Sequence, residues 1–205
     1  MNSRYSQEKW NQRWQEKASS AEWQADQWLV QTLPYLPDTG TALDLACGMG
    51  RNALCLAERG YRVTAVDFSE VALNLLRQAV MPGKGHIDVI QADLEAANFQ
   101  FPQGPFDLVL QCYYLYRPLL PALLEAVRPG GFAIIRTFSR AGEEQFGPVN
   151  KGISLAPGEL LHLFSEWDIL LYEEGLEPSR KGGSLAGIFA RKKKRGPCPP
   201  LEVTS

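Results

Sequence analysis

The sequence of 205 residues lacks several features that mark large classes of proteins. It has no run of about 18 apolar residues, so no membrane-spanning helix is expected. Its first residues, MNSRYSQEKWNQRWQEK, lack the apolar stretch of a secretion signal. Only two histidines are present and none of the four cysteines forms a C-x-x-C pair, so no metal site is expected. We therefore predict a cytoplasmic protein with reduced thiols and no membrane partner.

An excess of positive charge is also missing, since 21 Lys and Arg face 23 Asp and Glu. Proteins that bind nucleic acid are usually basic, so no nucleic-acid partner is expected. Five positive residues do stand together at 191–195, before a Pro-rich ending. We interpret this run as a solvated feature rather than a nuclear signal, and predict that residues 196–205 are disordered.

What the sequence does contain is an alternation of strands and helices over residues 41–138. Short apolar or β-branched runs predict strands at 41–46, 61–67, 86–93, 106–113 and 131–138. Amphipathic segments between them predict helices, such as the one that Ser69 would cap. This alternation indicates βαβ units and a doubly wound, mostly parallel α/β sheet.

The flanking segments complete a single predicted domain over residues 1–195. Residues 5–33 are predicted to be helical, with a break where Ser19 or Ser20 would cap a second helix. Together with the following loop they form an N-terminal helical cap, 1–36, beside a cofactor-binding core, 41–138. After a loop at 139–155, a helix is predicted from Pro157 to about Trp167, followed by closing strands at 168–174 and 184–191.

The most informative motif is the turn between the first strand and the first helix, Asp44-Leu-Ala-Cys-Gly48-Met-Gly50-Arg-Asn52. Glycines let the backbone turn tightly and let a ligand approach, and the following helix presents free N–H groups. The same pattern can also be a tight turn without a ligand. Because Gly48-x-Gly50-x-x-Ala53 fits a dinucleotide fingerprint, an NAD(P)-dependent oxidoreductase is the alternative reading.

Three carboxylates, one inside the first strand and two at strand ends, favour S-adenosylmethionine (SAM) over a dinucleotide. Asp67 can accept the hydroxyls of a ribose in either cofactor, but Asp44 would repel a pyrophosphate and attract the ammonium and sulfonium of SAM. Asp93 can accept from an adenine amino group while Leu94 packs on the ring. The alternative interpretation is that Asp67 and Asp93 are ordinary turn residues at strand ends that bind no ligand. A short-chain reductase would also need Tyr-x-x-x-Lys downstream, and the only such pair is Tyr5/Lys9, which lies upstream.

ALDLACGMGRNALCLAERGYRVTAVDFSEVAL closely resembles the class I SAM-dependent methyltransferases, as do VIQADLE and FDLVLQCYY followed by LLEAVRPGGFAIIRTFS. This resemblance implies a Rossmann-like sheet of seven strands in which only the last, SLAGIFAR, is antiparallel. The opening WNQRW and the segment 156–174 resemble small bacterial enzymes near the tellurite-resistance TehB group. A His-Arg pair thought to assist the chemistry there is matched here by LEPSRK, which has no histidine and leaves Arg180 as the candidate.

The expected site follows from these segments. Gln111, Cys112 and Tyr113 would line the floor beside the transferable methyl group, and Tyr113 joins Arg180 as a catalytic candidate. Arg13 would bind the cofactor's carboxylate, with Trp10 or Trp14 either closing a lid or simply docking the helix. The predicted cofactor-binding residues are Trp10, Arg13, Asp44, Ala46, Gly48, Gly50, Arg51, Asn52, Asp67, Phe68, Ser69, Asp93, Leu94, Gln111 and Cys112.

We therefore predict a methyltransferase that converts SAM to S-adenosylhomocysteine (SAH) while methylating a small molecule at sulfur, oxygen or a metalloid oxyanion. No Asn/Asp-Pro-Pro-Tyr motif is present, which weighs against amine acceptors. Only about 18 residues, 139–156, separate the fifth strand from the last helix, so no inserted substrate domain is expected. The chain is expected to be a monomer or a weak homodimer. A non-catalytic SAM-binding regulator is the remaining alternative.

Overall fold

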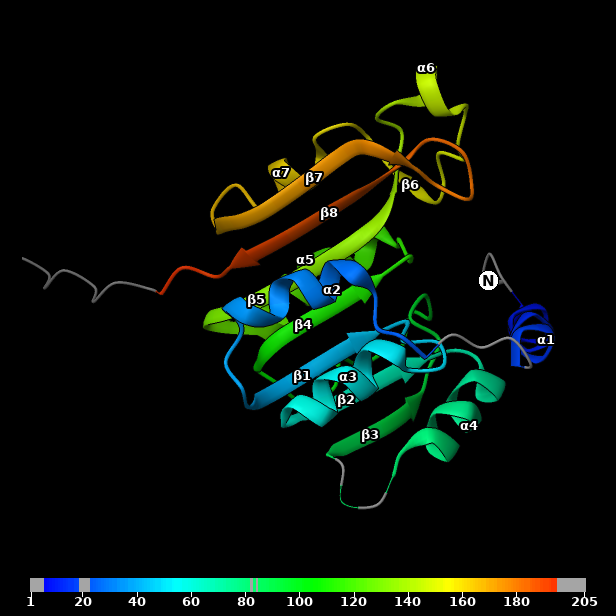
Figure 1. Ribbon diagram of the computed structural model, residues 1–205, viewed down its shortest axis with the longest axis vertical. Coiled ribbons are helices and arrows are strands. Elements are labelled where there is room, and N and C mark those ends of the chain that lie inside the picture. The colour runs from blue at the N-terminus through cyan, green and yellow to red at the C-terminus, as the bar shows by residue number, and fades with distance from the viewer. Residues whose placement is uncertain (1–5, 19–22, 82, 84, 195–205) are drawn as a thin grey trace, which may run out of the picture.

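The computed structural model describes residues 6–18, 23–81, 83 and 85–194, which form one twisted sheet with helices on both faces (Figure 1). The predicted disordered tail, 196–205, lies outside these residues. The strand order is β3-β2-β1-β4-β5-β8-β7, with β6 paired to β5 off this path. The strands are β1 Gly40–Leu45, β2 Tyr61–Asp67, β3 His86–Gln91, β4 Phe106–Cys112, β5 Val127–Ser139, β6 Ser154–Leu155, β7 Asp168–Pro178 and β8 Ser184–Arg191.

The pairing confirms the predicted doubly wound, mostly parallel sheet. Strands β1 to β5 pair in parallel, whereas β8 runs antiparallel to both β5 and β7. The seven expected strands are all present, and the two-residue β6 adds an eighth. Parallel pairing places the carboxyl ends of β1 to β4 along one edge, where doubly wound sheets bind their ligands.

Several helices cover the sheet because they present apolar side chains to it. The helical segments are α1 Gln7–Ala18, α2 Gln27–Thr32, η1 Leu33–Tyr35, α3 Arg51–Arg59, α4 Glu70–Ala79, η2 Arg117–Leu119, α5 Leu120–Ala126, α6 Glu143–Phe146 and α7 Glu159–Leu163. One buried cluster joins Trp28 and Leu29 of α2 to Leu56 of α3, and the other joins Leu123 of α5 to Leu160 of α7. The two clusters fill the opposite faces of the sheet. No helix among the described residues is both long and apolar enough to cross a membrane.

Two predicted helix starts are wrong. The second helix begins at Gln27 rather than near Ser19 or Ser20, because Asp26 is its N-cap and accepts a hydrogen bond from the Trp28 N–H at 3.0 Å. Ser19 and Ser20 themselves lie outside the described residues. The last predicted helix begins after Gly158, which has a φ of 74°, and ends at Leu163, so it is shorter than expected. In both cases the residue at the N-cap immediately precedes the first apolar turn of the helix, closer to it than the predicted start.

Helix α1 lies at the carboxyl edge of the sheet, beside α4 (Figure 1). None of its residues is fully buried, so it does not contribute to the main core. Two hydrogen bonds hold it to the end of β2: the Gln7 side chain donates to the Phe68 carbonyl at 3.1 Å, and Asn11 accepts from Ser69 at 2.7 Å. A polar helix is thereby fixed over the turns that follow the strands.

Candidate functional site

The glycine turn leaves β1 through a backbone that few residues can adopt. Gly48 and Gly50 have φ values of 57° and 79°, in the left-handed region that glycine tolerates. Ala46 is also left-handed, with a φ of 55°, which is unusual for a residue with a side chain. A Cβ on Gly50 would lie 2.4 Å from Leu76, so α4 packs directly on the turn. The turn is therefore held tightly between β1 and α4.

Asp44 is the buried carboxyl group of the site. It is 2% exposed, and its Oδ2 has no hydrogen-bond partner among the described residues. Burial, reinforced by the nearby Asp67 carboxylate, raises its pKa from 3.8 to about 8, against the smaller effects of the Ala53 N–H and Arg51. An unpaired buried carboxylate of this kind is costly unless a cation meets it. The donor set therefore fits a cationic ligand head, such as the ammonium of SAM, and is unsuited to a pyrophosphate.

Asp67 already uses both carboxylate oxygens within the protein. Oδ2 accepts from the Gly48 N–H at 2.7 Å and Oδ1 accepts from the Ser69 N–H at 2.8 Å. Burial raises its pKa, while the N–H groups of Ser69, Gly48 and Phe68 oppose that rise. Asp67 thus ties the glycine turn to the end of β2. The contact of Asp67 with a ribose stays a prediction. The ribose hydroxyls would have to donate to the lone pairs of Asp67 that these two hydrogen bonds do not use.

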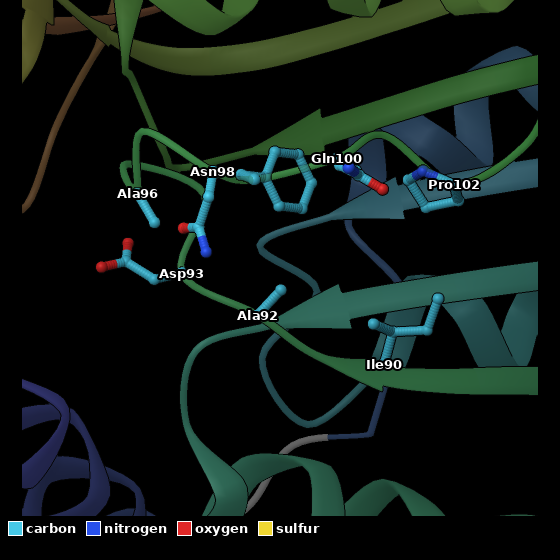
Figure 2. Close-up of a pocket in the computed structure, with 8 residues that line it drawn as sticks. Ile90, Ala92, Asp93, Ala96, Asn98, Gln100 and Pro102 are labelled. Carbon is cyan, nitrogen blue, oxygen red and sulfur yellow. The ribbon is translucent and has the colours of Figure 1, made fainter.

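An open pocket of about 390 Å³ follows the end of β3 (Figure 2). Asp93, Asn98 and Gln100 line it with polar side chains, while the other lining residues are apolar. Asp93 Oδ1 accepts from the Glu95 N–H at 2.9 Å, and Leu94 is only 6% exposed, so little of its side chain is left for a ring. The full lining is Ile90, Ala92, Asp93, Ala96, Asn98, Phe99, Gln100 and Pro102. Of the two predicted adenine contacts, Asp93 lines this pocket and Leu94 does not, and their binding of adenine stays a prediction.

The end of β4 carries the three residues predicted to line the floor of the site beside the transferable methyl group. Gln111 is fully buried, and its amide donates to the Tyr114 carbonyl at 2.9 Å, while its Oε1 has no hydrogen-bond partner within the described part of the chain. Cys112 is partly buried, and burial raises its pKa well above the ordinary value. Tyr113 is left-handed, with a φ of 57°, and is 38% exposed. Of the three, Tyr113 is thus the one whose side chain is substantially exposed at this edge.

Asp26 is a central residue that the sequence reasoning missed. It is 5% exposed, and its carboxylate accepts from the Tyr113 hydroxyl at 2.6 Å and from Arg51 at 3.0 Å. Its own N–H donates to Asn52 at 2.8 Å. Burial, then Asp26, raises the pKa of Tyr113 to about 12, so its phenol stays protonated. An Asp before the apolar run QWLV was a visible capping signal, but nothing local pointed to Tyr113.

Asp26 thus engages Arg51 and Asn52, two residues predicted to bind the cofactor. The Arg51 guanidinium also lies 5.8 Å from the centre of the Tyr113 ring, and Arg136 of β5 approaches Asp26 to 4.0 Å. These contacts join the start of α3 and the ends of β4 and β5 at one point. Ser69 is likewise occupied, since it caps α4 by accepting from the Ala72 N–H at 3.2 Å.

Helix α1 covers the glycine turn. A Cβ on Gly48 would lie 2.6 Å from the Trp14 ring, so this indole rests on the turn itself. Arg13 is exposed and stacks on Trp10, with its guanidinium 5.0 Å from the ring centre. Trp14 therefore docks α1 on this turn, and the choice between the two predicted roles of the tryptophans, lid or docking, stays a prediction. Whether the helix moves as a lid, and whether Arg13 binds a carboxylate, stay predictions.

The catalytic candidate Arg180 lies in the turn between β7 and β8, away from Tyr113 in sequence. Its positive charge is one of the smaller causes, after burial and Arg13, that lower the pKa of Lys17 in α1. The neighbouring Ser179 hydroxyl accepts from the Lys181 N–H at 3.1 Å, and the Gly183 N–H donates to the Gly147 carbonyl at 2.7 Å. The turn is therefore fixed from within and from the loop after β5.

Comparisons with known proteins identify relatives of this chain. A family model described as a methyltransferase domain matches residues 42–131. An uncharacterized methyltransferase of Synechocystis, sll0829, is 30% identical over 174 residues, covering 74% of this chain and 76% of that protein. The probable SAM-dependent methyltransferase TehB of Haemophilus influenzae is 28% identical over 163 residues, covering 74% of this chain and 57% of TehB. For the putative methyltransferase YqeM of Bacillus subtilis the covered share is 34%, so the chain spans only part of these two curated relatives.

Solved structures share the fold. TehB of Haemophilus influenzae superposes with a TM-score of 0.69 at 23% identity, covering 90% of this chain and 67% of that one. A TehB-like methyltransferase of Corynebacterium glutamicum gives 0.62 at 20% identity, covering 91% and 98%. At these identities the likeness supports the architecture, and the curated relatives identify the family.

Proposed function

The chain belongs to the class I SAM-dependent methyltransferases and resembles TehB, and from this we propose that it methylates a small molecule at sulfur, oxygen or an oxyanion. The observation that carries the proposal is Asp44, a buried carboxylate beside the glycine turn whose Oδ2 has no hydrogen-bond partner in the part of the chain that the structure describes. A pyrophosphate would be repelled there, so the oxidoreductase alternative finds no support at this position.

When bound, SAM supplies a methyl group on a sulfonium, which is already activated toward displacement. The protein's task is then mainly to position two reactants and to exclude water. Asp44 would hold the ammonium, and Asp67 would fix the glycine turn while accepting from the ribose. The N–H groups at the start of α3 and the pocket beside Asp93 would hold the rest of the cofactor. Trp14 on Gly48 would shield this end from solvent.

At the acceptor side, Tyr113 would act as a neutral hydrogen-bond donor. With its pKa raised to about 12 it is not a base at neutral pH, and Asp26 orients its hydroxyl. Nucleophiles that are already anionic need no general base, which agrees with sulfur or oxyanion acceptors. The segment between β5 and α7 holds only the short elements α6 and β6, so we propose that the acceptor is small.

Calorimetric titration with SAM, SAH and NADH tests the cofactor. We expect SAM and SAH to bind, and the Asp44→Asn variant to bind SAM far more weakly. Asp88→Asn is the matched control, because Asp88 is an exposed carboxylate of β3 that pairs with Arg62 and His86. Binding of NADH without any response to SAM would overturn the proposal.

Release of SAH in the presence of thiols, tellurite, selenite and carboxylates tests the reaction. We expect turnover with at least one of these acceptor classes. SAM binding without turnover by any of them would instead support a regulatory SAM-binding protein.

A further inference from the structure

Arg136 is a buried cation near the end of β5, and only 9% of it is exposed. Helix α2 lies over β4 and β5, and the Arg136 guanidinium stacks on Trp28 of that helix, 5.4 Å from the ring centre (Figure 1). The residue opposite Arg136 on β8 is Gly187, where a Cβ would lie 2.7 Å from the Trp28 ring. The lack of a side chain at Gly187 therefore leaves the room in which Trp28 and Arg136 stack.

The Arg136 guanidinium is held between two carboxylates. Its Nη2 pairs with Glu177 near the end of β7, a side chain that is 52% exposed. On the inner side, its Nε lies 4.0 Å from Oδ1 of Asp26, the N-cap of α2. Because a buried charge is costly unless it is paired, these carboxylates compensate for the burial of Arg136. The Arg136 side chain thereby ties the end of β7 to the start of α2.

Arg136 also fixes Tyr113 in two ways. The Arg136 carbonyl accepts from the Tyr113 N–H at 2.6 Å, which holds the left-handed residue just after β4 in place. The carboxylate of Asp26 accepts from the Tyr113 hydroxyl, also at 2.6 Å. A left-handed backbone costs free energy in a residue with a side chain, and it is frequent at functional sites. The backbone of Arg136 thus holds the backbone of Tyr113, and its guanidinium holds the carboxylate that binds the phenol.

We propose that Arg136 is a positioning residue for the methyl transfer, because it places the two catalytic candidates, Tyr113 and Arg180, relative to each other. Arg180 follows Glu177 by three residues, in the turn that begins where β7 ends. The Arg136–Glu177 pair fixes the start of that turn, and Asp26 transmits the position of Arg136 to Tyr113. This inference rests on the proposed function, and it adds a residue that sets the geometry of the reaction without touching the reactants.

A merely structural role for Arg136 predicts a different response of Tyr113. The pKa of Tyr113 is raised first by burial and then by Asp26, whereas the positive charge of Arg136 lowers it. If Arg136 only supported the packing, its loss would expose the phenol to water and the pKa of Tyr113 would fall. If Arg136 acts as a charge beside an intact Asp26–Tyr113 pair, its loss should raise that pKa. The two roles therefore differ in the sign of the change.

A fluorinated ring in place of Tyr113 measures this sign without knowledge of the methyl acceptor. Difluorotyrosine at this one position gives a single fluorine NMR signal, and its more acidic phenol brings the titration to lower pH. We expect the midpoint to rise in Arg136→Gln and to fall in Asp26→Asn. Arg136→Lys keeps the charge and should keep the midpoint near that of the parent. A midpoint that falls or stays unchanged in Arg136→Gln would overturn the inference.

The outer half of the arrangement is tested by Glu177→Gln, which removes an exposed carboxylate and leaves the core unchanged. This variant should shift the fluorine signal at position 113, and it decides the question if Arg136→Gln does not fold. Asp168→Asn is the matched control, because Asp168 is an exposed carboxylate at the other end of β7 that pairs with Arg191. The control should leave the signal unchanged. An identical signal in Glu177→Gln and the parent would break the proposed link and overturn the inference.

Turnover with any acceptor that yields SAH provides the kinetic test. Arg136→Gln and Glu177→Gln should lower kcat on the order of tenfold with SAH affinity unchanged, since a small displacement of a reacting group is costly. In a Tyr113→Phe background, Arg136→Gln should have a smaller effect on kcat than in the parent. Weakened SAH binding in Arg136→Gln, or full additivity with Tyr113→Phe, would reject the inference. Failure of SAM and SAH to bind the parent would instead reject the proposed function.

Discussion

Replacing Asp44 by asparagine should stabilise the free protein at alkaline pH and weaken its binding of SAM. The ordinary pKa of 3.8 applies in the unfolded chain, and burial raises it to about 8 in the folded chain. Between these values the folded state holds a proton that the unfolded state has released, so the free energy of unfolding falls as pH rises. The loss is about 1.4 kcal/mol per pH unit. The Asp44→Asn variant has no titrating group at this position, so its free energy of unfolding should show no such fall between these pH values.

The magnitude follows from the length of that window. A shift of about four pH units corresponds to about 5 kcal/mol at full deprotonation, as an upper bound. From pH 6 to pH 8 the parent should lose about 2.5 kcal/mol relative to Asp44→Asn. For a chain of this size the difference in Tm between the two proteins should widen by roughly 5–10 °C over that range. Differential scanning calorimetry of both proteins without ligand measures it.

Binding of SAM should show the opposite effect of the same substitution. The charged form of Asp44 meets the ammonium, so SAM affinity should rise with pH toward about 8 and protons should be released on binding. The α-amino group of the ligand also titrates near pH 8, so the contribution of Asp44 is the difference between the parent and Asp44→Asn. At pH 8 the variant should bind SAM on the order of 100-fold more weakly.

If Tm falls equally with pH in the parent and in Asp44→Asn, the reasoning about the buried charge is refuted. Equal SAM affinity in the two proteins would refute the pairing with the ammonium. Asp88→Asn serves as the control in both experiments, since its carboxylate is exposed and should show neither effect.

Gly48→Ala should destabilise the chain more than Gly158→Ala, because both glycines are left-handed but only Gly48 would clash with Trp14; urea unfolding compares them. Trp14→Ala should restore part of the loss in Gly48→Ala, and additivity in that double-mutant cycle would contradict the contact. Asp26→Asn should lower stability by about 1–3 kcal/mol, since buried partners lose a charged acceptor. Tyr113→Phe should raise KM or lower kcat for the acceptor with SAM affinity unchanged, and weakened SAM binding would contradict its place at the acceptor side.

Local patterns were sufficient for most of the sheet. Alternating apolar runs predicted every strand from β1 to β5, and the glycine turn and Asp67 were found at the strand ends where parallel pairing puts them. The boundaries were less predictable. The cap of α2 is Asp26 because it immediately precedes the apolar turn, whereas Ser19 and Ser20 are equally good caps by composition alone.

The sequence by itself determined the alternation of elements, the left-handed turn at Gly48 and Gly50 and the carboxylates at the strand ends, because periodicity and turn chemistry act over a few residues. Tertiary structure alone decided that Asp26 meets Tyr113, 87 residues away, and that Trp14 rests on Gly48. It also decided that both carboxylate oxygens of Asp67 accept hydrogen bonds from backbone N–H groups, whereas Oδ2 of Asp44 has no partner over residues 6–18, 23–81, 83 and 85–194. Such contacts depend on how distant segments pack, and desolvation, which sets the charge of Asp44, exists only once the chain has folded around it.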